Sequence, residues 1–75
     1  MKKRRFKVIL EWDVNEKVFT VAIPALPGCA TYGSTREEAL ERAHEAISVT
    51  IEGLQATGQP IPDGDVDITI DEVVV

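Results

Sequence analysis

The 75-residue sequence contains one cysteine, Cys29, and one histidine, His44, which excludes an internal disulfide and a metal centre of clustered Cys and His ligands. It also lacks any run of 18 or more apolar residues, the length that a membrane-spanning helix needs. A domain this short buries a modest core, and disulfides, metals or self-association usually reinforce it. By elimination we expect a homo-oligomer, either a dimer or a tetramer.

Basic residues are scarce outside the N-terminus. Residues 1–7 hold five of the eight basic groups, and residues 8–75 keep three against all 13 acidic ones, a net charge of −10. An acidic body repels nucleic acid and attracts a basic partner. The basic arm, residues 1–5, is read either as a solubilising terminus or as a phosphate contact. Because Glu11 and Asp13 interrupt the apolar stretch that a secretory signal requires, we expect a cytoplasmic protein.

Alternating apolar residues predict three strands before the middle of the chain. Residues 6–13 alternate with one apolar face, and residues 18–23 do the same after the turn formers Asp13 and Asn15, which indicates a hairpin. Residues 29–32 form a short third strand. The outer side chains of the hairpin would line a second, less covered sheet face.

The segment from Pro24 to Cys29 joins the second and third strands. Pro24 cannot donate to a ladder, so it either ends the second strand or lies on a sheet edge, and Gly28 supplies backbone freedom after Pro27. One interpretation is a structural turn that sets the strand crossing. The other is a rigid rim of a protein interface, with Leu26 and Pro27 as contacts, because a preordered loop lowers the cost of binding.

A helix over residues 36–57 is predicted by its caps and its period. Gly33 breaks the third strand, Thr35 fits an N-cap followed three residues later by Glu38, and Gly58 and Pro60 fit the end of the helix. Residues 66–70 alternate again and predict a last strand. The expected fold is α+β in the order β-β-β-α-β, a small antiparallel sheet with one helix on one face, in a single domain covering residues 1–75.

Four glutamates share the helix face opposite the apolar stripe: Glu38, Glu41, Glu45 and Glu52. Glu41 and Glu45 are a like-charge pair one turn apart, which is mildly unfavourable for the helix. This acidic stripe is either a solvated face or a docking surface for a basic protein. The docking hypothesis predicts electrostatic steering of a partner, which raises the association rate more than the affinity.

The spaced motifs of the chain resemble those of the HicB antitoxin family. The resemblance covers residues 6–70 and rests on the segments Ile23–Cys29 (IPALPGC), Gly33–Thr35 (GST), Glu37–Ala39 (EEA), Glu45–Ile47 (EAI) and Gly58–Pro62 (GQPIP). It implies a truncated ribonuclease H-like fold and a partner of the HicA type, a small basic toxin that cleaves mRNA. It also implies that a C-terminal DNA-binding domain follows in many members. The chain ends about where that domain would begin, so we expect no DNA binding by this chain alone.

The functional prediction is an antitoxin domain that binds a HicA-type toxin and blocks it sterically, without catalytic residues, cofactor or metal. The alternative is a stand-alone HicB-like oligomer that serves as a regulatory or adaptor protein without a toxin. A nuclease is the weakest hypothesis. Ribonuclease H enzymes carry a metal-binding carboxylate on the first strand, where Glu11 and Asp13 lie, but two-metal chemistry needs three or four converging carboxylates.

Overall fold

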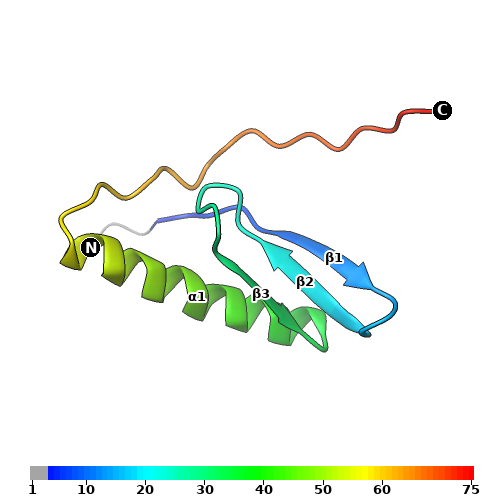
Figure 1. The fold of residues 1–75 in the computed structure, drawn as a ribbon, viewed down its shortest axis with the longest axis horizontal. Coiled ribbons are helices and arrows are strands. Elements are labelled where there is room, and N and C mark those ends of the chain that lie inside the picture. Colours follow the sequence, from blue (N-terminus) through cyan, green and yellow to red (C-terminus); the bar gives the residue numbers. More distant parts are fainter. Residues whose placement is uncertain (1–3) are drawn as a thin grey trace.

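The computed structural model describes residues 4–75, so the first three residues of the predicted basic arm lie outside the described part. A sheet of strands β1 (Ile9–Asp13), β2 (Val18–Ala22) and β3 (Ala30–Gly33) precedes one helix, α1 (Arg36–Ala56). The strands are antiparallel and lie in the order β1-β2-β3 (Figure 1). The α+β class, the hairpin and the single long helix that the sequence predicts are confirmed.

The hairpin between β1 and β2 is closed by one aspartate. The Asp13 carboxylate accepts the backbone N–H groups of Asn15 and Glu16 at 3.0 and 3.1 Å, and the Asp13 carbonyl accepts the N–H of Lys17 at 2.7 Å. Lys17 takes a left-handed conformation, with φ of 56°. The turn fixes the register of the hairpin, in which Trp12 lies opposite Phe19. The two rings pack edge to face, with their centres 4.9 Å apart.

The core lies between α1 and one face of the sheet. Val21 from β2 packs with Ala39 and Ala43 of α1, and Leu10 and Phe19 pack around this cluster. The small alanine side chains let the helix backbone approach the sheet closely. Within residues 4–75 nothing covers the opposite sheet face. Its side chains alternate with those of the core, as the sequence predicts: Ile9, Val18, Thr20 and Ala22.

The segment between β2 and β3 forms two consecutive tight turns. The N–H of Leu26 donates to the carbonyl of Ile23, and the N–H of Cys29 donates to the carbonyl of Leu26, both at 2.9 Å. Gly28 has φ of 86°, a conformation that a residue with a Cβ rarely adopts. Leu26 is only 4% exposed, so its side chain anchors the turns in the core.

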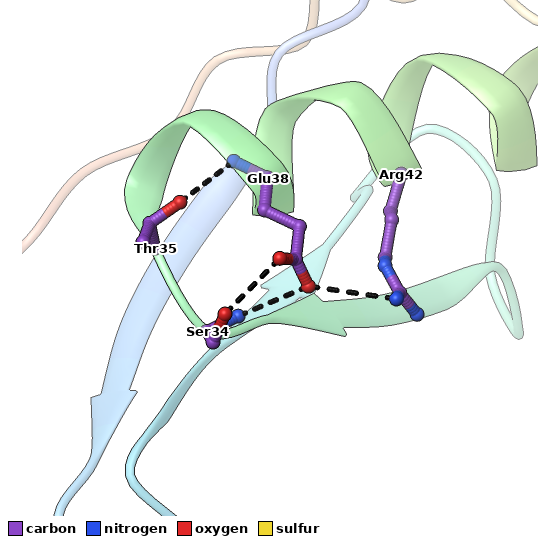
Figure 2. A network of polar contacts seen from close by, with 4 residues as sticks. All are labelled: Ser34, Thr35, Glu38 and Arg42. Atoms are coloured by element: carbon purple, nitrogen blue, oxygen red, sulfur yellow. Dashed lines mark hydrogen bonds and ion pairs between the residues drawn. The ribbon is translucent and has the colours of Figure 1, made fainter.

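The N-terminus of α1 is capped by Thr35, as predicted (Figure 2). The Thr35 hydroxyl accepts the N–H of Glu38 at 3.0 Å. The Glu38 carboxylate reaches back past the cap and accepts the N–H and the hydroxyl of Ser34, at 3.3 and 3.0 Å. The glutamate therefore ties the helix to the end of β3 and does more than close its own first turn.

Replacing Thr35 with alanine should lower the free energy of unfolding by about 1 kcal/mol, because the N–H of Glu38 then loses its acceptor. Thr35→Ser is the matched control, since it keeps the hydroxyl. Urea unfolding followed by circular dichroism at fixed protein concentration would measure both. Equal stability of the alanine and serine variants would contradict this assignment of the cap.

The C-terminus of α1 ends in a Schellman motif. The N–H of Gln59 donates to the carbonyl of Leu54 at 2.9 Å, and the N–H of Gly58 donates to the carbonyl of Gln55 at 3.2 Å. Gly58 has φ of 71°, which suits a residue without a Cβ. The predicted stop at Gly58 is confirmed, and Pro60 follows it.

The predicted last strand does not form, and the order is corrected to β-β-β-α within residues 4–75. Residues 59–75, called the tail below, run in the same direction as β1 and stand apart from the sheet (Figure 1). The tail contacts the segment that leads into β1, because the backbone N–H of Lys7 donates to the Gly64 carbonyl at 3.1 Å. The Lys7 ammonium also donates a hydrogen bond to the Val66 carbonyl, at 2.7 Å. Beyond Val66 the tail makes no backbone hydrogen bond with β1 in the structure.

Candidate protein-binding surface

The outer face of α1 carries three of the four predicted glutamates in an exposed position. Glu41, Glu45 and Glu52 are exposed along the helix. Glu38 is only partly exposed, and its carboxylate is already bonded to Ser34. The free acidic charge of this face therefore lies in the middle and the second half of the helix.

Arg42 lies beside this acidic face and was not singled out from the sequence. Its guanidinium is 3.5 Å from the Glu38 carboxylate, one helical turn away (Figure 2). It also sits over the ring of Tyr32 on β3, 5.6 Å from the ring centre, a cation–π distance. Arg42 thus links α1 to β3 and neutralises the first glutamate of the stripe.

A shallow groove runs between α1 and β3, and we call it the α1–β3 groove. It has a volume of about 470 Å³ and joins the end of the β2–β3 turns to the acidic helix face, with Gly28, Cys29, Thr31, Arg42, Glu45 and Val49 in its lining. Val49 is 66% exposed, an apolar side chain off the core stripe of the helix. The groove therefore combines one carboxylate, Glu45, and the Arg42 guanidinium with apolar surface, a composition that protein interfaces use.

The two predicted contacts of the β2–β3 segment lie on opposite sides of its backbone. Pro27 is exposed next to Gly28 at the end of the α1–β3 groove, whereas Leu26 is buried in the core. A buried side chain cannot meet a partner, so Leu26 is left out of the surface proposed below. Gly33 is buried where β3 meets the first turn of α1.

A second depression lies on the uncovered face of the sheet. It is lined by Asp13, Glu16, Val18, Thr20, Ala30 and Tyr32, and Tyr32 is 56% exposed. Val18 and Thr20 were predicted for this face from their alternation. The alternation of side chains along β3 could have placed Tyr32 on one face of its strand. It could not show which strand lies beside β3, because alternation within one strand does not specify its neighbour in the sheet.

Within residues 4–75 no group of three or more His, Cys, Asp or Glu side chains is placed to hold a metal ion. The Asp13 carboxylate, considered above for nuclease chemistry, accepts two backbone N–H groups of the hairpin turn. Among the described residues, no helix is both long enough and apolar enough to cross a membrane.

A sequence model of the family described as the HicB-like antitoxin of bacterial toxin–antitoxin systems matches residues 6–74. The match covers the sheet, the helix and nearly all of the tail. It therefore includes every residue that lines the α1–β3 groove.

Three curated proteins illustrate what the chain is similar to. A UPF0150 protein of Thermoplasma acidophilum is 40% identical over 67 residues, which are 88% of this chain and 96% of the relative. A UPF0150 protein of Synechocystis is 46% identical over 60 residues, 80% of this chain and 75% of the relative. The antitoxin HicB 1 of Photorhabdus laumondii is 39% identical over 62 residues, which are 83% of this chain and only 39% of that antitoxin. No solved structure matches the chain.

Proposed function

Because the chain belongs to the HicB-like antitoxin family, we propose that it binds a small basic HicA-type toxin that cleaves mRNA and inhibits it sterically. The observation that carries the proposal is the exposed acidic face of α1, with Glu41, Glu45 and Glu52, of which Glu45 lines the α1–β3 groove. Pro27 is exposed next in sequence to Gly28 of the same groove. The chain turns over no substrate in this role. It inhibits the toxin by covering the toxin surface that RNA would bind.

Charge supports this choice of surface. A ribonuclease binds the phosphates of its substrate with Lys and Arg side chains, and carboxylates can take the place of those phosphates. Glu41 and Glu45 repel one another across one helical turn, and a cation bound between them would relieve that repulsion. Val49 beside them adds apolar area that a partner would bury.

Reversing the charge of Glu41 and Glu45 to lysine should weaken toxin binding by roughly tenfold or more, because two attractive contacts become repulsive. The partner to test is the small basic protein expected from the adjacent reading frame. Co-expression would show the loss as poorer rescue of growth, and calorimetry would give the dissociation constant.

The double variant Glu11→Lys with Glu16→Lys is the matched control. It makes the same charge change on the β1–β2 hairpin, at the other edge of the sheet from β3. Circular dichroism should show both variants folded. Normal rescue by the helix variant would remove the α1–β3 groove as the toxin site, and absence of any bound basic protein would favour the stand-alone regulatory or adaptor role.

We further propose that the chain works as a homo-oligomer, a dimer or a tetramer, in the cytoplasm, where mRNA is found. The described sheet leaves the outer edges of β1 and β3 without a strand neighbour, and unpaired edges are templates for association. The core is also small. Its buried apolar residues are Val21, Ile23, Leu26, Ala39 and Ala43, which leaves stability to be gained by burying more surface.

A further inference from the structure

We propose that Tyr32 of β3 and Glu38 of α1 form a binding site for an arginine side chain of a basic partner, and that Arg42 of the same chain fills this site until the partner displaces it. The inference rests on the proposed function, because it states how the basic partner would be recognised beside the acidic face of α1. It starts from a contact within the molecule, in which Tyr32 and Glu38 hold the Arg42 guanidinium together.

The group that fills the site shows which ligand the site suits. The Arg42 guanidinium carbon lies 5.6 Å from the centre of the Tyr32 ring, and a guanidinium nitrogen lies 3.5 Å from a Glu38 carboxylate oxygen. An aromatic face and a carboxylate both attract a guanidinium. Because a guanidinium is planar, it can stack on the ring and still donate to the carboxylate, whereas a lysine ammonium is a point charge. The site therefore favours arginine over lysine.

Both halves of the site are held in place by contacts that do not involve Arg42. The Glu38 carboxylate accepts the backbone N–H and the hydroxyl of Ser34, at 3.3 and 3.0 Å (Figure 2). Tyr32 lies within β3, where it pairs with Thr20 of β2. The site should therefore keep its shape when Arg42 leaves, and a preformed site lowers the cost of binding a new guanidinium.

Arg42 is held weakly enough to be displaced. Its side chain is 49% exposed and that of Glu38 is 40% exposed, and ion pairs and cation–π contacts at such exposed positions contribute little to stability. Tyr32 is more than half exposed, so a partner can reach its ring. Arg42 also lines the α1–β3 groove together with Glu45. A basic partner bound at Glu45 would therefore lie next to Arg42 and could put its own arginine in place of it.

Competition from Arg42 gives this surface a way to select its partner. Two cations cannot fill one site, so a partner must move Arg42 aside, and its apparent affinity is reduced by the fraction of molecules in which the site is free. A partner with an arginine at the right position regains the contacts with Tyr32 and Glu38. A basic protein without such an arginine does not regain them and binds more weakly, which is how a surface discriminates between partners of similar charge.

The first test uses a hexa-arginine peptide as the probe, titrated into the full chain by calorimetry. Arg42→Met should bind the peptide about fivefold more tightly than Arg36→Met, because only the first variant frees the site of its competitor. Arg36 is an exposed arginine at the start of the same helix, so the two variants have equal net charge. Circular dichroism should show both folded, since methionine is a good helix former. Equal affinities, or weaker binding by Arg42→Met, would overturn the proposal.

The second test asks whether the Tyr32 ring receives the guanidinium. Adding Tyr32→Leu to Arg42→Met should abolish the gain in affinity, whereas adding Tyr32→Phe, which keeps the aromatic face, should retain it. The gain should also be smaller with hexa-lysine than with hexa-arginine. A full gain in the leucine variant, or an equal gain with hexa-lysine, would overturn the site.

These titrations use no toxin, so their failure is distinct from failure of the proposed function. If the charge reversals at Glu41 and Glu45 weaken toxin binding while the hexa-arginine titrations show no difference between Arg42→Met and Arg36→Met, the toxin surface stands and the arginine site falls. If the hexa-arginine results are as expected but the charge reversals leave toxin binding unchanged, the arginine site stands without the toxin.

Discussion

Replacing Gly33 with alanine should remove about 3 kcal/mol or more of stability, a large part of the total for a domain of this size. Gly33 is the last residue of β3, where the strand passes directly under the first turn of α1. A Cβ at this position would lie 2.7 Å from the Cα of Ala39 and 2.8 Å from the Glu38 carbonyl carbon. Those are backbone atoms of a capped helix, so they cannot move aside without separating α1 from the sheet.

Gly53→Ala is the matched control for Gly33→Ala. A Cβ at Gly53 meets no atom within 4 Å, and the residue lies inside α1. Alanine is the better helix former there by about 1 kcal/mol, so the same chemical change should stabilise the protein. Urea unfolding at one protein concentration should therefore separate the two variants in opposite directions. Similar midpoints for Gly33→Ala and wild type would show that α1 can shift on the sheet.

Local signals account for the parts of the fold that the sequence predicts well. The caps at Thr35 and Gly58 act within a few residues of themselves, and the Asp13 turn closes on its own neighbours. Such features depend on backbone groups that are close in sequence, so residue type and spacing are enough to place them. The strand and helix bounds follow to within about three residues.

Long-range pairing is where the sequence pattern is insufficient. Residues 66–70 have the alternation of a strand, but alternation specifies a face and not a neighbour. In the structure these residues form no strand, and the Val66 carbonyl accepts a hydrogen bond from the Lys7 side chain, 59 positions away in the sequence. Glu38 is a second example. Its position on the helix groups it with the exposed glutamates, but its carboxylate accepts hydrogen bonds from Ser34 and pairs with Arg42.

The candidate surface shows the same division between local and long-range information. The helical period places Glu41, Glu45 and Glu52 on one side of α1, and the structure leaves them exposed. The groove beside them lies between α1 and β3, the strand that the helix contacts most. The packing of α1 on β3 brings Glu45, Val49 and Gly28 into one groove, and a local sequence pattern does not specify such a long-range contact.

The two residues Leu26 and Pro27 should respond to substitution in opposite ways, which tests the division of the β2–β3 segment into anchor and rim. Leu26→Ala should cost about 3 kcal/mol of stability, because Leu26 is 4% exposed and its loss leaves a cavity beneath the two turns. Pro27→Ala should change stability by less than about 1 kcal/mol, because Pro27 is exposed at the surface. If Pro27 contacts the toxin, Pro27→Ala should weaken toxin binding. Leu26→Met keeps the side-chain volume and should leave the dissociation constant unchanged. Thermal unfolding and calorimetric titration of the three variants would decide it, and a stable Leu26→Ala protein with impaired toxin binding would return Leu26 to the interface.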